Sequence, residues 1–259
     1  MPVPSVACFR DRLSGGERML GTFLKSPGPH ATEILGDVGF DFVVVDAEHA
    51  PFDRGDIDLI ALAGRAAQID VLVRVQSADP VEILSALDCG ATGVLVPHIA
   101  DAGTAQAIVA AARYGGGTRG FSNSPRAGGY GRRGFRDHIE QADASVAVLA
   151  MIEDIAALDH LDAIFAVGGL TGAFIGRGDL SAQLGVGAPD APEIRHIVER
   201  IVAASKRHGL PLLAHVGAVD APDALWLHSL GVSSFIVSSD QGLMRQAALA
   251  SVSRFVKAR

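Results

Sequence analysis

Aromatic residues and cysteines are scarce in this chain of 259 residues. Aromatic residues make up 5%, with a single tryptophan, and the two cysteines, Cys8 and Cys89, form no metal-binding pair. Hydrophobic residues reach 49%, so the large core that the chain can bury must consist mainly of alanine, valine, leucine and isoleucine. The composition therefore excludes a metal site built on clustered cysteines and predicts an aliphatic core.

The chain also lacks a basic excess and long apolar runs. It has 22 basic against 29 acidic residues and a net charge of −7, whereas proteins that bind nucleic acids or anionic membranes usually show the opposite balance or a basic run. No apolar stretch approaches the roughly 20 residues that cross a bilayer. Residues 1–20 lack the long apolar segment of a signal peptide. We therefore expect no nucleic-acid or membrane partner and a cytoplasmic location.

Short apolar runs alternate with segments of 3.6-residue periodicity along the chain. Eight strands that alternate with helices, in a chain of this length, predict an α/β fold of the (β/α)8 (TIM) barrel type, as a single domain over residues 1–259. A doubly wound open sheet is the alternative, but no glycine-rich turn follows the first strand. The expected strands are Leu20–Leu24, Phe42–Asp46, Val71–Val75, Gly93–Pro97, Val146–Ile152, Gly172–Ile175, Leu210–Ala214 and Ser234–Val237. The expected helices include Ile57–Gln68, Pro80–Asp88, Thr104–Arg113, Ala191–His208 and Pro222–Leu230.

A loop rich in glycine and arginine, residues 114–134, interrupts this pattern. So long a loop within a compact domain is usually functional or disordered. Arg119 and Arg126 suit the closure of a mobile loop over a carboxylate or phosphate, and we consider both as substrate-binding residues. They suit a solvated or subunit-contact loop equally well, and the adjacent Arg132 and Arg133 are typical of a solvated surface.

Polar side chains occur where most of the expected strands end. In a TIM barrel the carboxyl ends of all eight strands converge on one face, and catalytic residues lie there. The strongest example is the stretch FVVVDAEHAP, in which a buried strand is followed by acidic residues and a histidine. The residues concerned are Glu48, His49, Arg74, His98, Glu153, Asp179, His215 and Asp240.

Two of these carboxylates could share a cation. Glu153 and Asp179 close consecutive strands, which lie ~4.8 Å apart in a sheet. Two carboxylates without cysteine or paired histidine suit a hard divalent ion, Mg²⁺ or Mn²⁺. The alternative is that Asp179 only caps a helix. Gly176 and Gly178 would let the backbone approach an anionic ligand, or they could form an ordinary tight turn.

Arg74 and His49 are candidates for catalysis. Arg74 is a cation within an apolar strand and should meet either a protein carboxylate or an anionic ligand. His49 could act as a general base near neutral pH if a carboxylate orients it, and Asp88 is a candidate for that role. Structural pairing is the alternative for both residues.

From about Gly21 to Asp240, the chain resembles the HpcH/HpaI aldolase family of metal-dependent class II pyruvate aldolases. The family includes aldolases that act on 2-keto-3-deoxy sugar acids and on 4-hydroxy-2-oxoheptanedioate. The motifs that carry the resemblance, all in family order, are FDFVVVDAEHAP, VLVRV, ALDCGATGVLVPHI, TRGFSNSPRAGGYG, MIED and FIGRGDLSAQLG. The resemblance implies a homo-oligomer, since family members assemble as hexamers, often as trimers of dimers.

The resemblance also implies the ligands of a divalent cation, Mg²⁺, Mn²⁺ or Co²⁺. Glu153 and Asp179 would hold the ion, and the backbone at Gly178 and Asp179 would hold the carboxylate of pyruvate. No other cofactor is expected.

The catalytic residues implied by the resemblance are His49, Asp88 and Arg74. His49 would be the base, Asp88 would assist it, and Arg74 would bind the keto oxygen and stabilise the enolate. The family commonly has a glutamine two residues before the metal-binding glutamate, and this chain has Met151 there.

The expected reaction is the reversible retro-aldol cleavage of a 4-hydroxy-2-oxo acid to pyruvate and an aldehyde. A Schiff-base route is disfavoured because Lys25, after the first strand, has no obvious partner. One alternative is an acyl-CoA lyase of the citrate lyase type, although no adenine site is evident. Another is a non-catalytic protein that binds keto acids, for which Met151 is the best argument.

Overall fold

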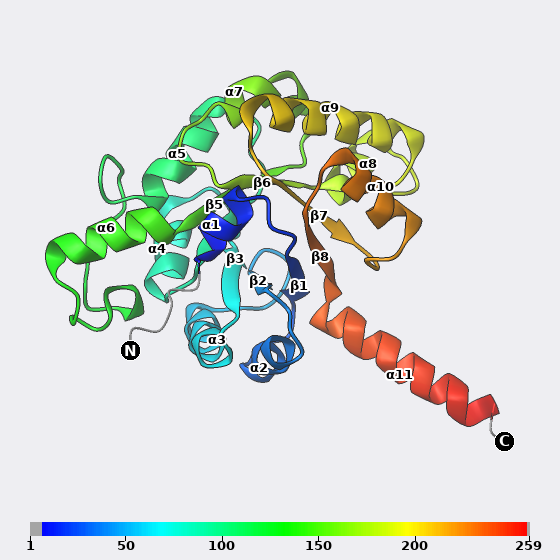
Figure 1. Ribbon diagram of the computed structural model, residues 1–259, viewed down its shortest axis with the longest axis horizontal. Coiled ribbons are helices and arrows are strands. Elements are labelled where there is room, and N and C mark those ends of the chain that lie inside the picture. Colours follow the sequence, from blue (N-terminus) through cyan, green and yellow to red (C-terminus); the bar gives the residue numbers. More distant parts are fainter. Residues whose placement is uncertain (1–6, 258–259) are drawn as a thin grey trace.

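Eight parallel strands close into a barrel in the order of the sequence, with β8 pairing with β1. The structure is a computed structural model, which describes residues 7–257 (Figure 1). The strands are β1 (Leu20–Leu24), β2 (Phe42–Asp46), β3 (Asp70–Arg74), β4 (Gly93–Val96), β5 (Ala147–Ile152), β6 (Gly172–Ile175), β7 (Leu212–Val216) and β8 (Ser234–Ser239). The predicted TIM barrel is confirmed.

Helices cover the outside of the barrel and connect its strands (Figure 1). The α-helices are α1 (Phe9–Ser14), α2 (His30–Asp37), α3 (Arg54–Ala67), α4 (Pro80–Asp88), α5 (Ala102–Ala112), α6 (Phe135–Ser145), α7 (Leu161–Phe165), α8 (Arg177–Leu184), α9 (Pro192–His208), α10 (Pro222–Leu230) and α11 (Asp240–Lys257). Two short 3₁₀ turns are η1 (Arg126–Gly128) and η2 (Ile155–Asp159). None of the described helices combines the length and the apolar character needed to span a bilayer.

The predicted boundaries differ most at the seventh strand. We expected Leu210–Ala214, whereas β7 begins at Leu212 and runs to Val216. Leu210 still belongs to the turn after α9, where its amide donates to Ser205 O. Pro211 has no amide hydrogen, so the strand begins after it. As a result His215 lies within β7 rather than after it.

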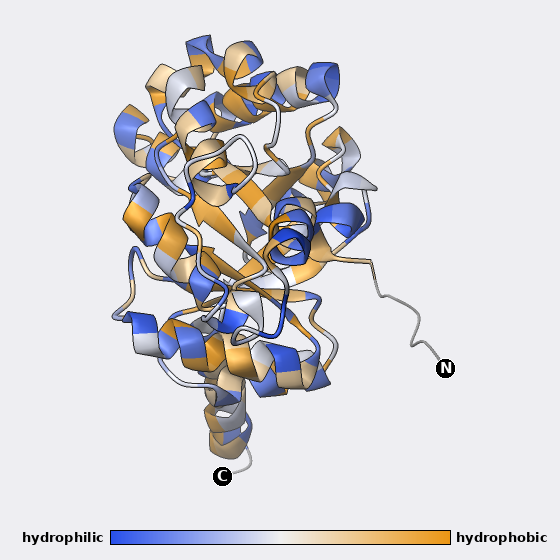
Figure 2. Ribbon diagram, turned by 90° about the vertical axis from the view of Figure 1, so that its left-hand side faces the viewer, coloured by the Kyte–Doolittle hydropathy of each residue, from blue (hydrophilic) through white to orange (hydrophobic). Residues whose placement is uncertain are grey.

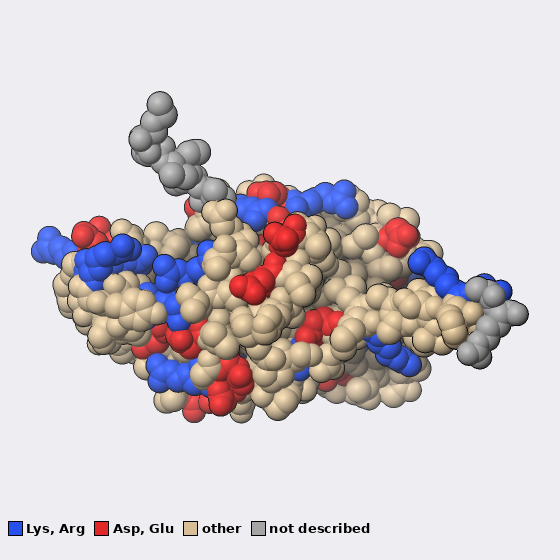
Figure 3. Space-filling view, turned by 90° about the horizontal axis from the view of Figure 1, so that it is seen from below, with Lys and Arg blue, Asp and Glu red and all other residues tan. Residues whose placement is uncertain are grey.

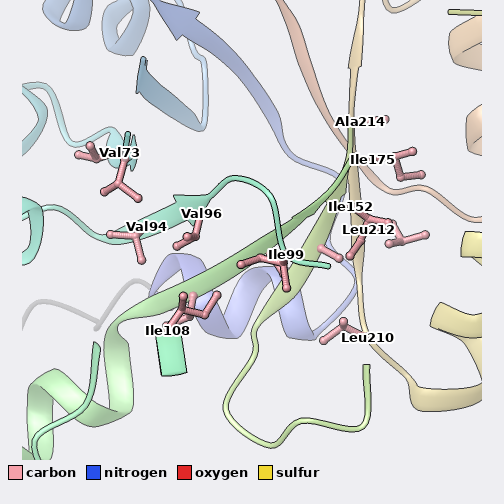
Figure 4. Packing of buried hydrophobic residues seen from close by; sticks show 14 of the residues in the cluster. Val73, Val94, Val96, Ile99, Ile108, Ile152, Ile175, Leu210, Leu212 and Ala214 are labelled. Atoms are coloured by element: carbon pink, nitrogen blue, oxygen red, sulfur yellow. The ribbon is translucent and has the colours of Figure 1, made fainter. Parts of the chain in front are cut away.

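The alternation of side chains along the strands divides the core into two layers. One layer fills the inside of the barrel, and the other lies between the strands and the helices. Figure 4 shows part of the outer layer, where Val73, Val94 and Val96 project from the strands and Ile108 from α5. The hydropathy colours of Figure 2 show the same division, with apolar strands inside and mixed helices outside.

Helix α1 closes the amino-terminal end of the barrel. Its residues Phe9 and Leu13 are completely buried and belong to the same apolar cluster as the inward-facing residues of the strands. The Phe9 ring meets the Phe42 ring edge-on, with centroids 5.2 Å apart. The inside of the barrel is therefore a packed apolar core that α1 closes at its amino-terminal end.

The glycine- and arginine-rich loop, residues 114–134, lies at the closed end of the barrel. It follows α5, which returns the chain from the carboxyl end of β4, and it precedes α6 and the start of β5. Loops in this position join a helix to the next strand and are on the face opposite the carboxyl ends. The prediction that this loop closes over the active site is therefore wrong within one chain, whereas a subunit-contact role stays a prediction.

Replacing Phe9 by alanine should destabilise the protein by about 3–5 kcal/mol, because the change leaves a cavity in the sealed base. Denaturant unfolding followed by circular dichroism measures this difference. The matched control is Phe135→Ala on α6, where the side chain is 62% exposed and the loss should be about 1 kcal/mol or less. Equal losses for the two variants would contradict the assigned role of α1.

Candidate active site

Inward-facing positions change from apolar to polar at the carboxyl ends of the strands. On β2 the series Phe42 and Val44 ends in Asp46, and on β5 the series Leu149 and Met151 is followed by Glu153. On four other strands, the residue two positions after the last inward-facing apolar residue is also polar. These are Lys25 after β1, Arg74 on β3, His215 on β7 and Ser238 on β8.

Asp46 is the buried centre of this polar layer. Its side chain is 0% exposed, and Oδ1 accepts from Arg74 Nε at 2.9 Å, from Arg74 Nη2 at 2.7 Å and from the His49 amide at 3.1 Å. Its other oxygen accepts from Lys25 Nζ at 2.5 Å. Burial alone would raise the pKa of Asp46, but the hydrogen bonds from Lys25 and Arg74 outweigh it and lower that pKa. Asp46 is therefore ionised at neutral pH.

Glu48 and two histidines lie beside this centre. Arg74 Nε is 3.3 Å from Glu48 Oε2, and His49 Nε2 is 3.7 Å from the same oxygen. His98 Nε2 is 3.8 Å from Glu48 Oε1. The His49 ring is 56% exposed, so it lies at the rim of the mouth.

Glu153 is buried, with 2% of its side chain exposed, and accepts from the His98 amide at 2.8 Å. Burial raises the pKa of Glu153 to about 7; His98 opposes this shift, and the charges of Asp179 and Glu48 add to it. A cation would relieve the crowding of three carboxylates. The position of the Glu153 side chain depends on the glycine at 176, because a Cβ there would be 2.4 Å from Glu153 Cβ and 2.8 Å from Glu153 Oε2.

The first turn of α8 presents Gly178 and Asp179 to an open cavity of about 610 Å³. Both residues are exposed, and the helix begins at Arg177, with Gly176 before it. Asp179 is therefore in the first helical turn, and the alternative that it caps the helix is wrong. Arg74 and Met151 line the same cavity.

Hard divalent ions take oxygen ligands and keep several waters, and the donors here match that preference. Within residues 7–257, no group of three or more histidine, cysteine, aspartate or glutamate side chains is arranged to hold a metal ion. A cation would therefore depend on Glu153 and Asp179 together with waters and substrate oxygens.

Three predicted site residues lie elsewhere in the chain. Asp88 ends α4 at the closed end of the barrel, where it pairs with Arg119 at 3.1 Å. Arg126 pairs with Asp58 at 2.6 Å. Since α4 runs back from the carboxyl end of β3, Asp88 cannot orient His49 of the same chain. The prediction of that pairing is wrong within one chain, and neither arginine lies near Glu153 of the same chain.

The sequence pattern placed Asp46, Lys25 and His98 at strand ends but did not reveal the contacts that they make. Asp46 was visible as the end of a buried strand, directly beside the noted Glu48 and His49. Its register with Arg74 on β3 provides the missing signal, since these residues are direct neighbours across the two strands. His98 has a positive φ of 57°, and its amide donates to Glu153, a role that no side-chain pattern reveals.

A family model described as HpcH/HpaI aldolase/citrate lyase matches residues 19–226. The chain belongs to this family. It is 36% identical over 246 residues to a 5-keto-4-deoxy-D-glucarate aldolase of Klebsiella pneumoniae subsp. pneumoniae, with 92% of this chain and 93% of the relative covered. It is also 36% identical over 231 residues to a 2-dehydro-3,6-dideoxy-6-sulfogluconate aldolase of Pseudomonas putida, with 88% and 89% covered.

Solved structures of similar proteins have the same fold. A HpcH/HpaI aldolase/citrate lyase family protein from Burkholderia cenocepacia is similar with a TM-score of 0.89 and 29% identity, over 95% of this chain and 98% of that one. The citrate synthase SbnG is similar with a TM-score of 0.86 and 30% identity, over 97% and 98% of the two chains.

The titration of Glu153 should make the metal-free protein less stable as the pH rises. The folded state, with a pKa of about 7, holds the proton more tightly than the unfolded chain, where a glutamate has a pKa near ~4.3. The free energy of unfolding should therefore fall between about pH 4.5 and 7, by up to about 3 kcal/mol. Denaturant titrations in EDTA measure it, and Glu153→Gln should remove this component. If wild type and variant have parallel pH profiles, Glu153 is not the group concerned.

Proposed function

We propose that the protein is a divalent-metal-dependent pyruvate aldolase. It cleaves a 4-hydroxy-2-oxo acid to pyruvate and an aldehyde, and it catalyses the reverse condensation. The observation that carries this proposal is the buried carboxylate of Glu153 beside Asp179 at a cavity that Arg74 also lines. The named relatives are aldolases of keto-deoxy sugar acids, which supports the same class of reaction.

The substrate binds through its 2-oxo acid end. Glu153 and Asp179 would hold the cation, Mg²⁺, Mn²⁺ or Co²⁺, which would supply Lewis-acid polarisation of the 2-oxo group. The amide of Leu180 donates to Gly176 O, whereas the amides of Gly178 and Asp179 precede it in the first turn and remain available for the substrate carboxylate.

Arg74 stabilises the charge that develops on the keto oxygen. Its Nε and Nη2 are bonded to Asp46, and its Nη1 makes none of these bonds. Asp46 thus holds the guanidinium through Nε and Nη2, and Arg74 also lines the cavity. As the C3–C4 bond breaks, the electron pair moves into the enolate of pyruvate, and Arg74 stabilises the resulting oxyanion. A proton from water then adds at C3 and gives pyruvate.

His49 takes the proton from the 4-hydroxyl group, directly or through a water. Glu48, which is 3.7 Å away, is the carboxylate of the same chain that can orient it. Asp88 can assist His49 only if the base of a second barrel approaches this mouth. The family role of Asp88 therefore requires an oligomer.

Met151 gives the cavity an apolar floor. Its side chain is buried and lies in one cluster with Phe23 and Phe174, where many family members have a glutamine. The floor keeps water away from the developing enolate, but it provides no hydrogen bond to the keto acid. A protein that binds pyruvate without turnover is the alternative, and exchange of the pyruvate methyl protons with solvent separates the two, since only a catalyst exchanges them.

Citrate-forming or citrate-cleaving chemistry is the second candidate function. The likeness to the citrate synthase SbnG over nearly the whole chain favours it. Incubation with oxaloacetate and acetyl-CoA tests it, through the release of free thiol. Activity there, without cleavage of any 4-hydroxy-2-oxo acid, would replace the aldolase proposal.

Removing divalent cations should abolish aldol cleavage, and Mg²⁺, Mn²⁺ or Co²⁺ should restore it. Glu153→Gln and Asp179→Asn should each lower kcat/KM by about 10²-fold or more. The matched control is Asp190→Asn, which neutralises another aspartate of the same cavity and should retain most of the activity. Pyruvate release is followed by a coupled assay. Full activity after chelation, with trapping of a pyruvate adduct on Lys25 by borohydride, would contradict the proposal.

The protein assembles as a homo-oligomer, a hexamer built from three dimers. Helix α11 supports this, because it projects from the barrel (Figures 1 and 2) and none of its described residues is buried. Its exposed apolar residues include Met244, Leu249, Val252 and Val256, each more than half exposed.

Sedimentation equilibrium should give a mass several times the 26.8 kDa of one chain. The double variant L249E/V252E on α11 should lower that mass, because two charges would be buried at the subunit contact. The control is V81E on α4, where Val81 is 67% exposed, and it should leave the mass unchanged. A monomeric wild type would contradict the proposal.

A further inference from the structure

A second cavity, of about 270 Å³, lies at the closed end of the barrel, between α3, α4 and the loop of residues 114–134. It shares no lining residue with the catalytic cavity. Among the residues that the structure describes, five arginines line it and no acidic residue does, although the chain as a whole carries a net charge of −7. Figure 3 shows basic side chains gathered at the end of the molecule that α6 and this loop occupy. The arginines are Arg65, Arg119, Arg126, Arg132 and Arg133.

Only part of this positive charge is neutralised. Arg119 pairs with Asp88 at 3.1 Å, and Arg126 pairs with Asp58 at 2.6 Å. The other three arginines form no ion pair among the residues that the structure describes. Around this cavity, five guanidinium groups therefore meet two carboxylates, which leaves three positive charges in excess. This excess of positive charge around one cavity favours an anion.

The two buried arginines are held in place and keep unused donors. Arg126, with 6% of its side chain exposed, donates from Nε to Cys89 O at 3.0 Å and from Nη2 to Asp58, and these bonds leave Nη1 over. Gly90 has a φ of +94°, and a Cβ there would be 2.7 Å from Arg126 Cδ. The glycine at position 90 therefore leaves room for the Arg126 side chain along the wall of the cavity.

Arg119 has a fully buried side chain whose Nε and Nη1 have no hydrogen-bond partner. The ring of Tyr114 covers one face of its guanidinium, 4.5 Å from the ring centroid, but an aromatic face does not satisfy donors at the edge. Buried donors without a partner are costly, and a donor that no protein group satisfies usually meets an ordered water or an ion.

We infer that this cavity is a binding site for a small oxyanion that carries two negative charges, such as phosphate. Guanidinium forks match the oxygens of phosphates and carboxylates, and a cavity of this size holds one such ion rather than a nucleotide. Arg65 and Arg132, which are exposed, approach the ion from the solvent side, and Arg126 Nη1 approaches it from the wall. Arg119, which also lines the cavity, adds its positive charge.

Isothermal titration of the full-length protein with inorganic phosphate tests this site. The protein is first saturated with Mg²⁺ and pyruvate, so that the catalytic cavity is occupied. Phosphate should bind with saturation at one site per chain. The double variant R65Q/R132Q should weaken binding by about tenfold or more, because two charge-assisted hydrogen bonds are lost. Titrations with sulfate and malonate show whether the site prefers tetrahedral or planar oxyanions.

The matched control is R18Q/R136Q, which removes the same charge from two exposed arginines outside the cavity and should bind phosphate as the wild type does. Activity should be the same in both double variants, so the outcome is independent of the proposed aldolase reaction. The inference is overturned if no saturable binding of phosphate occurs, or if both double variants bind equally well. It is also overturned if R65Q/R132Q lowers the sedimentation mass while phosphate does not bind, because the cavity then receives a carboxylate from a second copy of the chain.

Discussion

The ion pair between Asp46 and Arg74 is the contact on which the mouth of the barrel depends. The two residues are direct neighbours on β2 and β3, and each would be costly to bury without the other. Asp46 also accepts from Lys25 and from the His49 amide, so one carboxylate fixes three strands and the loop that carries His49. Arg74 is thereby held in one orientation before any ligand arrives, which is the condition for stabilising an oxyanion without reorganisation.

Charge is separated between the two ends of the barrel. At the open end, Glu153, Asp179 and Glu48 form a negative group that favours a cation. At the closed end, arginines without enough acidic partners form a positive group that favours an anion. The apolar interior between them, sealed by Phe9 and Leu13, keeps these groups from neutralising each other. The same alternation of side chains that builds the core thus permits two sites of opposite charge.

Much of the fold and part of the site could be predicted from the sequence. The apolar runs identified all eight strands, and the polar residue after each run identified Arg74, Glu153 and Asp179 as neighbours of one cavity or of each other. The seventh strand was predicted two residues too early, because Leu210 belongs to the same apolar run. The strand begins only after the proline that follows Leu210.

The positions of Asp88, Arg119 and Arg126 within one chain could not be predicted, for a different reason. A motif shows that residues matter but not at which end of the barrel they lie, and these three lie at the end of a helix or in the loop after one rather than at the end of a strand. Direction along the chain would have separated them, since a helix in this fold returns to the amino-terminal end. Contacts made through the backbone, such as that of the His98 amide with Glu153, leave no trace in the pattern of side chains.

Because α1 closes the amino-terminal end of the barrel, ligands reach its interior from the carboxyl end of the strands. Whatever enters past His49 must leave by the same route, because no passage leads out through Phe9. A molecule bound next to Met151 therefore cannot leave while a second molecule occupies the cavity nearer the rim. For a substrate split in two, the outer fragment departs first and the inner one follows, and in the reverse direction the inner partner must be loaded before the outer one.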